Sequence, residues 1–597
     1  MTASVKTRSN TREFLCSLLP ILTWLPNYER AWLRTDIMAG LAVWAMTVPQ
    51  ALAYAGIAGV PPVYGLYTVP LAMVAYAVFG TSRTLSVGPE SAIAIISAVT
   101  VGGLVAQDPN EFLVLTSMLT LVVGVLFLLF GFLRLGWVAN FLSQPVLQGF
   151  TQGIALIVII GQLPKLFGTE ATVGKLVENM NNLPHLIGLE VNYSGFFLQA
   201  WAVLATLGEA NLSTTVVGLG ALALLFALKR FWPLAPSALI AVILSVLAVS
   251  ILGLAGRGVG LIGAVETGMV SLAVPALSVG KLAALLPGAF AIVLLGYSVS
   301  LSVAAVGAQA TGEEINPNQE LIGLGVANMG AALSSGFVVC GSLSRGVVIR
   351  RAGGRTQVVS LVNAGLLFLT LLFVLPLFFN LPNATLAAIV IQAMFGLLNF
   401  AYLRQLFRID RGEFVYAMAA LFGVLVLGLL QGVALGVILS LVVLIRRVSH
   451  PATAVLGRLP GTDTYRDITV RSEAETIPGL LIFRFDAPII FANAAYFAEQ
   501  MRQLISDAST PIQEVLVPAQ QINQLDSTGA NQLERLYTEL EAKGISLSFA
   551  EVKSALREAM RRNGLEENIG SDRFFKSIHE GVQAFLQSQE KIPGGKE

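Results

Sequence analysis

Residues 112–132 read FLVLTSMLTLVVGVLFLLFGF, a run without a single charged side chain. An α-helix rises about 1.5 Å per residue, so a helix of this length matches the roughly 30 Å thickness of the hydrocarbon core of a bilayer. The run therefore predicts a helix that spans a membrane. Similar runs, such as residues 419–436, indicate that the chain crosses the membrane many times.

The composition divides the chain into a membrane part and a soluble part. Of the 597 residues, 55% are hydrophobic and only 12% are charged, whereas soluble domains contain roughly 25% charged residues. Charged residues are scarce between residues 37 and 446 and ordinary in number after residue 447. We therefore predict an N-terminal segment at 1–36, a transmembrane domain at 37–449, a linker at 450–466 and a soluble domain at 467–590.

We predict about fourteen membrane spans, at residues 37–58, 64–80, 88–106, 112–132, 147–167, 212–230, 236–254, 287–308, 321–336, 342–352, 358–379, 384–399, 413–430 and 432–447. An even number places both termini on the same side of the membrane. Basic residues are enriched in cytoplasmic loops, and the loops on this side carry Arg83, Arg134, Lys229, Arg230, Arg350, Arg351, Arg355, Arg404, Arg408, Arg411, Arg446 and Arg447. The opposite loops carry Lys165, Lys175, Arg257 and Lys281. Both termini are therefore predicted to be cytoplasmic.

The C-terminal part alternates between strands and helices. Buried strands are predicted at 480–485, 514–517 and 545–549, and helical periodicity is present at 496–506, 528–543 and 553–563. This alternation is typical of a small α/β domain.

Several classes of protein have no support in the sequence. Cys16 and Cys340 lie too far apart in the sequence to indicate a disulfide framework, and His185, His450 and His579 are scattered. We therefore predict no metal site and no cofactor, and we do not expect an enzyme. The net charge of +1 gives no sign of a nucleic-acid partner.

Two predicted spans are interrupted, and each is the third in its set of seven. The third span begins with SVGPES at 86–91; the tenth, too short and polar to cross a bilayer alone, begins with CGSLSR at 340–345. Paired interrupted helices in two halves of a transporter indicate its substrate site. Helix N-termini favour anions, so two starts that face each other would form an anion site. The alternative is that both are ordinary loop-to-helix junctions.

Several short motifs occur along the membrane part of the chain: PQALAYA at 49–55, PPVYGLY at 61–67, GTSR at 80–83, NPNQELIGLG at 316–325, GSLSR at 341–345 and LPNATLAAIV at 381–390. In these motifs and in their order, the chain resembles the sulfate permease (SulP) family of anion transporters. In the soluble part, LDSTG at 525–529 resembles the STAS domain, which the family shares with anti-sigma-factor antagonists.

The resemblance implies a polytopic α-helical membrane protein with two inverted repeats of seven spans, followed by a cytoplasmic α/β STAS domain. The repeats would form a core domain that moves against a gate domain, commonly in a homodimer. The anion would bind between the starts of the third and tenth helices, beside the first helix. By position, the substrate-binding residues would be Gln50, Tyr54, Glu90, Ser91, Ser344 and Arg345.

Arg345 and Glu90 each allow two interpretations. Charged residues inside a membrane domain are costly and usually functional, so Arg345 would attract the anion, or would pair with Glu90 in an empty site. Alternatively, Arg345 is the first basic residue of a cytoplasmic loop. A charged Glu90 would repel an anion, and burial favours the neutral form of a carboxylate, so a proton and an anion would bind together. Alternatively, Glu90 is a helix N-terminal residue, stabilised by the dipole and paired with Arg345.

A departure from the family pattern also favours proton coupling. Many relatives resemble Gly-Phe-Ala-Glu-Ser in the eighth span, with a carboxylate often linked to cation coupling, but this chain reads Gly-Tyr-Ser-Val-Ser at 296–300. Because Val299 replaces the carboxylate, a sodium site on this helix is doubtful. We therefore predict Glu90 as the coupling group and a proton as the driving ion.

In bacterial relatives of the STAS domain, a serine in the motif that resembles residues 526–529 can be phosphorylated. Ser527 and Thr528 are thus possible phosphorylation sites here. The simpler interpretation is that Asp526 and Ser527 cap the helix that begins near Thr528. The domain would stabilise, regulate or dock the transporter, with a cytoplasmic protein as a possible partner.

These observations together predict a secondary active anion transporter of the inner (cell) membrane, specifically a sulfate:proton symporter that works by alternating access. The choice of sulfate comes from the resemblance alone. Bicarbonate, chloride or dicarboxylate transport or exchange remains an alternative, as does an anion channel. A membrane-anchored sensor that signals through the STAS domain is a further alternative.

Overall fold

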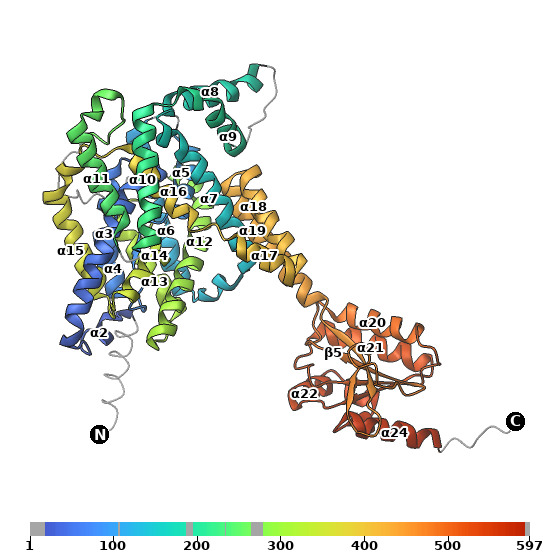
Figure 1. Ribbon diagram of the computed structural model, residues 1–597. Coiled ribbons are helices and arrows are strands. Elements are labelled where there is room, and N and C mark those ends of the chain that lie inside the picture. Colours follow the sequence, from blue (N-terminus) through green and yellow to red (C-terminus); the bar gives the residue numbers. More distant parts are fainter. Residues whose placement is uncertain are drawn as a thin grey trace, which may run out of the picture. The chain divides into compact units, whose positions relative to one another are not determined.

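The computed structural model describes residues 18–105, 108–141, 143–186, 195–232, 235–263 and 279–590. It divides the chain into two compact units, Met1–Ser440 and Leu441–Glu597. The first unit consists almost entirely of helices, and the second is built around a β-sheet (Figure 1). The predicted N-terminal segment lies partly outside the described residues, and its last residues already belong to helix α3, which begins at Leu33.

Each of the fourteen segments predicted as spans contains a helix. These helices are α3 Leu33–Ala58, α4 Pro62–Phe79, α5 Ser91–Gly102, α6 Pro109–Phe132, α7 Gln144–Phe167, α10 Leu212–Phe231, α11 Ser237–Leu252, α12 Val279–Thr311, α13 Pro317–Leu333, α14 Leu343–Arg351, α15 Val358–Leu369, α16 Asn383–Phe395, α18 Arg411–Leu427 and α19 Leu429–Ser449. Among the described residues, eight helical stretches are long and apolar enough to cross a bilayer. Large apolar side chains such as Leu212, Ile251 and Phe373 are exposed on the surface of this unit, as a hydrocarbon solvent would allow.

Four further helices among the described residues of the unit were not among the predicted spans. They are α2 Ile21–Trp24, α8 Glu170–Leu186, α9 Gly195–Ala205 and α17 Phe400–Ile409. Each is shorter or more polar than a membrane-spanning segment needs to be, so hydropathy alone does not reveal them.

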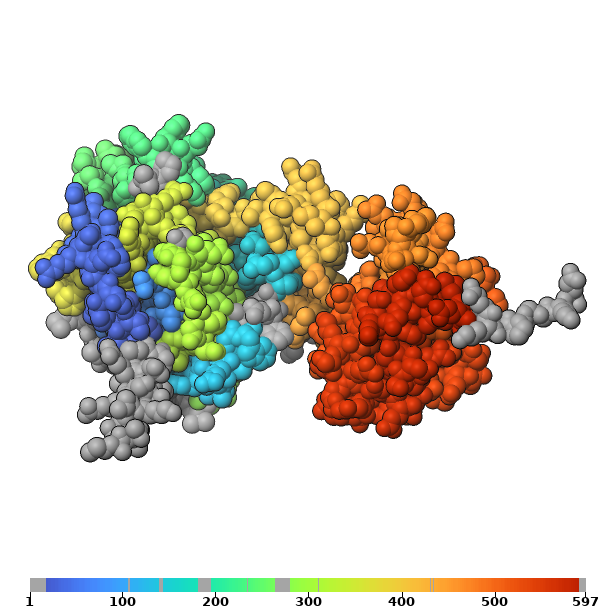
Figure 2. All heavy atoms as spheres, turned by 90° about the horizontal axis from the view of Figure 1, so that it is seen from below, coloured from blue at the N-terminus to red at the C-terminus, as the bar shows by residue number. Residues whose placement is uncertain are grey.

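Helices from the two halves of the unit pack against each other. Helix α13 packs against α4 and α6, and α15 packs against α3. On the face drawn in Figure 2, atoms from the first helices (blue) accordingly lie beside atoms from the second half (yellow-green). Small residues permit close approach of helices: a Cβ atom on Gly149 would lie 2.0 Å from the Ala417 carbonyl oxygen, so only glycine fits between α7 and α18.

The second unit contains a six-stranded sheet of order β4-β3-β5-β6-β7-β8. The strands are β3 Thr453–Arg458, β4 Tyr465–Asp467, β5 Leu480–Phe485, β6 Glu514–Pro518, β7 Ser546–Ala550 and β8 Phe574–Phe575. Strands β5 to β8 are parallel, whereas β3 pairs antiparallel with β4 and β5. The helices are α20 Ala494–Ser506, α21 Ser527–Ala542, α22 Ser554–Arg562, α23 Leu565–Ile569 and α24 Ile578–Glu590.

The structure corrects the predicted linker at 450–466. Part of this segment is folded into the sheet, because it forms β3 and the start of β4. Side chains of β3 alternate between half-buried and buried over its first four residues, and Ala454 and Leu456 join an apolar cluster with Leu480 and Ile482. This buried face secures the strand within the sheet.

Candidate functional site

The starts of the two interrupted helices lie side by side in the structure. Each short helix follows a two-residue strand, β1 Val87–Gly88 before α5 and β2 Cys340–Gly341 before α14. These strands pair antiparallel, with Val87 opposite Gly341, and Ser342 N donates to the Ser86 carbonyl oxygen at 3.2 Å. The predicted juxtaposition of the two helix starts is therefore confirmed by this backbone pairing.

Glu90 is the N-cap of α5. Its backbone is extended, and its carboxylate accepts hydrogen bonds from Ala92 N at 2.8 Å and from the Ser91 hydroxyl at 3.0 Å. A side-chain oxygen in this position satisfies an N–H group that has no partner within the helix. The carboxylate is half-buried, while Ser91 is fully buried.

The start of α14 is different, because its N-cap, Ser342, makes no capping hydrogen bond through its side chain. The Ser342 hydroxyl lies instead 3.1 Å from that of Ser344, which is exposed. The N–H groups of the first turn of α14 are therefore not satisfied by a side-chain cap.

Arg345, in the first turn of α14, is completely buried. One terminal nitrogen, Nη1, donates to the Pro89 carbonyl oxygen at 3.1 Å, but Nε and Nη2 have no hydrogen-bond partner among the described residues. A Cβ atom on Gly88 would lie 3.1 Å from Nη2, so the glycine gives the guanidinium room against β1. A buried cation with unsatisfied donors is costly and usually marks a functional site.

The predicted pairing of Glu90 with Arg345 is not present. Both residues are described, and no ion pair joins them; the Glu90 carboxylate is held by its own helix start instead. Tyr54, Cys340 and Glu90 nevertheless lie close enough to the Arg345 guanidinium to interact with it electrostatically.

Helix α3 contributes the remaining predicted residues. Gln50 and Tyr54 lie one turn apart on α3, which packs against α5, and each is 6% exposed. The Gln50 side-chain oxygen is buried and has no hydrogen-bond partner among the described residues. Thus Glu90, Ser91, Arg345 and Tyr54 gather around the two helix starts, whereas Ser344 lies at their exposed edge.

Sequence reasoning missed one contributor to this site, Ser300 on α12. Its hydroxyl accepts a hydrogen bond from Gly341 N at 2.8 Å and thereby fixes β2. Ser300 directly follows Val299, and a single serine within an apolar helix gives no sequence signal for a contact with a distant strand. No described group of three or more His, Cys, Asp or Glu residues is arranged to hold a metal ion.

In the second unit, Ser527 and Thr528 are exposed in the first turn of α21. Asp526 is the N-cap and accepts from Gly529 N at 2.7 Å, and its other oxygen accepts from Phe491 N at 2.8 Å. The capping role predicted for Asp526 is confirmed, and Ser527 is the first residue of the helix.

Comparisons with known proteins agree with this architecture. The model of the sulfate permease family matches residues 33–420, and that of the STAS domain matches residues 471–581. The chain is 36% identical over 577 residues to a probable sulfate transporter of Mycobacterium tuberculosis, which covers 95% of this chain and 100% of the relative. It is 31% identical over 597 residues to the chloroplastic sulfate transporter 4.1 of Arabidopsis thaliana, covering 98% and 85%.

Two solved structures share the fold. The structure of SLC26A9 matches with a TM-score of 0.84 and 20% identity, over 98% of this chain and 96% of that one. The transmembrane domain of a cyanobacterial bicarbonate transporter, BicA, matches with a TM-score of 0.59 and 23% identity, over 69% and 98%.

Proposed function

This chain belongs to the sulfate permease family, and from that premise we propose that it is a secondary active anion transporter, specifically a sulfate:proton symporter that works by alternating access. The family and the relatives named above are transporters, so the chain is not an enzyme. Both relatives are named as sulfate transporters, and this supports sulfate as the proposed substrate.

The burial of Arg345 and its unpaired donors support this proposal most strongly. Its guanidinium is fully buried beside two helix starts, and two of its nitrogens have no hydrogen-bond partner among the described residues. A tetrahedral oxyanion offers acceptors for these nitrogens and for the N–H groups of α14, and its charge would compensate the buried cation. The substrate would thus supply the partner that the protein leaves out.

Glu90 would couple this binding to a proton. Its carboxylate lies at the neighbouring helix start, so an entering dianion would raise the cost of its negative charge. Protonation removes that repulsion, and the proton and sulfate then bind together. Gln50, Tyr54, Ser91 and Ser344 would complete the substrate site.

The test is sulfate uptake into proteoliposomes with the membrane potential clamped and an inward proton gradient imposed or omitted. One pH unit supplies about 1.4 kcal/mol per proton, enough for about tenfold accumulation. Wild type should concentrate sulfate only with the gradient, whereas Glu90→Gln should merely equilibrate it. If wild type ignores the gradient, or if Glu90→Gln still concentrates sulfate, the coupling mechanism is wrong.

The same preparation discriminates the other substrates. Bicarbonate, chloride and dicarboxylates are offered as competitors and, in preloaded vesicles, as exchange partners. Flux that does not saturate and does not depend on protons would identify a channel.

The proposal extends to the assembly. Both termini and the STAS domain would lie in the cytoplasm, with the transporter as a homodimer in the inner membrane. The STAS domain would stabilise the transporter or dock a cytoplasmic protein, with phosphorylation of Ser527 or Thr528 as a second route of regulation. Transport by a chain ending near Ser449 would argue against a sensor that signals through this domain.

A further inference from the structure

The loop that leads into the first half of the anion site has no regular structure of its own. Residues 80–86 connect α4 to β1 and form neither helix nor strand. They nevertheless deliver Ser86, β1 and Glu90 to the site. Their position must therefore be set by contacts with other parts of the unit.

Glu320 provides the most extensive of these contacts. It lies in the first turn of α13 and is completely buried. One carboxylate oxygen, Oε1, accepts from Thr81 N at 2.7 Å, from the Thr81 hydroxyl at 2.5 Å and from Ser82 N at 3.0 Å. The other, Oε2, accepts from the Tyr76 hydroxyl at 2.6 Å. A carboxylate that receives several such bonds is held strongly, because each bond is charge-assisted.

Neighbouring side chains reinforce the same loop. Gln319 Nε2 donates to the Phe79 carbonyl oxygen at 2.8 Å. Gln357, just before α15, donates through Nε2 to the carbonyl oxygens of Ser82 at 2.7 Å and Leu85 at 2.9 Å.

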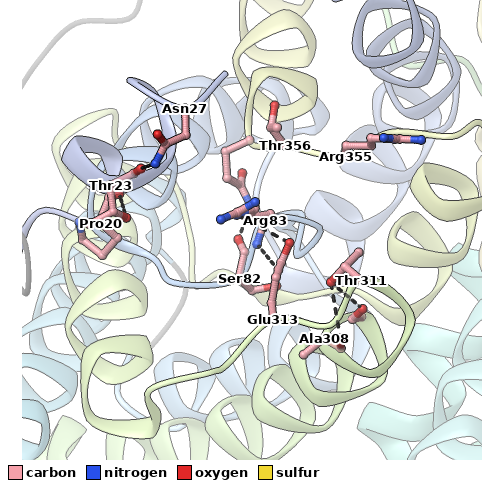
Figure 3. A network of polar contacts seen from close by, with 12 residues as sticks. Pro20, Thr23, Asn27, Ser82, Arg83, Ala308, Thr311, Glu313, Arg355 and Thr356 are labelled. Atoms are coloured by element: carbon pink, nitrogen blue, oxygen red, sulfur yellow. Dashed lines mark hydrogen bonds and ion pairs between the residues drawn. The ribbon is translucent and has the colours of Figure 1, made fainter. Parts of the chain in front are cut away.

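An ion pair at the surface completes this set of contacts. Figure 3 shows Arg83 reaching Glu313, a contact of 3.5 Å between the side chains. The loop from the first half of the unit is thus held by residues of the second half.

We propose that Glu320 is a positioning residue, which keeps β1 and Glu90 in register with β2 and Arg345. This inference rests on the proposed function, because it names what keeps that anion site assembled. Ser82 is separated from Gly88 by only five residues, so a shift of the loop at Thr81 and Ser82 reaches the β1–β2 pairing. It then displaces the Pro89 carbonyl that accepts from Arg345.

The first test measures sulfate uptake by the full chain in proteoliposomes. Glu320→Gln keeps the volume of the side chain but loses its charge and one acceptor oxygen, and we expect KM to rise about tenfold, equivalent to about 1.4 kcal/mol of binding, with a smaller change in kcat. Tyr76→Phe removes one of the four donors and should raise KM less. Glu314→Gln is the matched control, because Glu314 is exposed in the preceding loop and should leave KM unchanged.

The second test needs no transport substrate. In a Cys16→Ser background, the remaining thiol is that of Cys340, which is buried in β2. Glu320→Gln should speed alkylation of Cys340 by a maleimide several-fold, because the loosened β1 no longer covers β2, and Glu314→Gln should not.

The outcomes separate this inference from the proposed function. If wild type does not transport sulfate, sulfate is not the substrate, and the alkylation rate of Cys340 still tests the positioning role of Glu320. If Glu320→Gln lowers only the thermal stability and leaves both KM and alkylation at wild-type values, Glu320 is merely structural and the inference is overturned. Should Glu320→Gln fail to fold, Tyr76→Phe and Thr81→Val face the same two measurements, and wild-type values for both would equally overturn it.

Discussion

The starts of α5 and α14 occupy corresponding places in the two halves of the helical unit, yet they satisfy their polar groups in opposite ways. The start of α5 carries a carboxylate, and Glu90 uses it to cap its own helix. The start of α14 carries a cation, and its N-cap Ser342 makes no capping bond through its side chain. In the part of the chain that the structure describes, two nitrogens of Arg345 have no hydrogen-bond partner. The difference teaches that the α5 start satisfies its own polar groups, whereas under the proposed function the anion would satisfy those of the α14 start.

The largest expected effect comes from removing the unsatisfied cation. Arg345→Gln should lower kcat/KM for sulfate about 100-fold, equivalent to roughly 3 kcal/mol, because a buried charge contact to the anion is lost. Arg351→Gln, at the exposed end of α14, is the control. Since Arg345 is buried with unsatisfied donors, its loss should not reduce thermal stability. If Arg345→Gln keeps the wild-type KM but unfolds at a lower temperature, Arg345 has a structural role and the contrast between the two helix starts does not reflect anion binding.

The next effect separates capping from coupling at Glu90. Glu90→Gln keeps an oxygen for Ala92 N, so its thermal stability should match wild type while its uptake no longer depends on pH. Glu90→Ala also loses the cap and should be less stable by about 1 kcal/mol. Uptake by wild type should fall as the pH on the entry side rises. A pH profile of Glu90→Gln that follows wild type would assign the proton to another group.

A smaller effect is expected from the support behind α14. Ser300→Ala removes the acceptor of Gly341 N and should cost about 1 kcal/mol, raising KM roughly fivefold. Ser302→Ala is the matched control, because the Ser302 hydroxyl donates only within its own helix, to the Ser298 carbonyl oxygen. Equal KM values for the two variants would remove Ser300 from the site.

The smallest effect on transport is expected at a third helix start, that of α21, which is capped by a carboxylate like α5 and whose first residues are exposed. Asp526→Ala should destabilise the STAS domain by about 1 to 2 kcal/mol in thermal or denaturant unfolding. Uptake should stay near the wild-type rate. Ser527→Ala is the control and should change neither quantity. A strong loss of transport in Ser527→Ala would instead support regulation through this serine.

The positions of the long apolar helices could be predicted because hydrophobic length is a local property of the sequence, whereas the short or polar helices α2, α8, α9 and α17 could not. The breaks before α5 and α14 were also visible, since Gly88, Pro89 and Gly341 interrupt apolar runs. The β1–β2 pairing could not be predicted, because a strand of two residues has no periodicity. The strand β3 within 450–466 was not predicted either, because its alternation of half-buried and buried side chains extends over only four residues.

The interaction between Glu90 and Arg345 shows where charge reasoning fails. The opposite charges of Glu90 and Arg345 at neighbouring helix starts suggested an ion pair. The Glu90 carboxylate instead accepts a hydrogen bond from Ala92 N, which is only two residues away in the sequence. Arg345 donates a hydrogen bond to the Pro89 carbonyl oxygen, on the other side of the β1–β2 pairing. Hydrogen bonds to nearby backbone groups thus replace the expected ion pair between Glu90 and Arg345, and the sequence alone does not show which of the two forms.

The pairing of β1 with β2 also limits how the proposed transport cycle can proceed. The two halves of the site are joined to each other through backbone hydrogen bonds, so they cannot part without breaking those bonds. The anion would therefore stay bound between the paired starts of α5 and α14 throughout the transport cycle. Access to the binding site would open and close alternately on the two sides of the membrane, while the pairing of β1 with β2 stays intact.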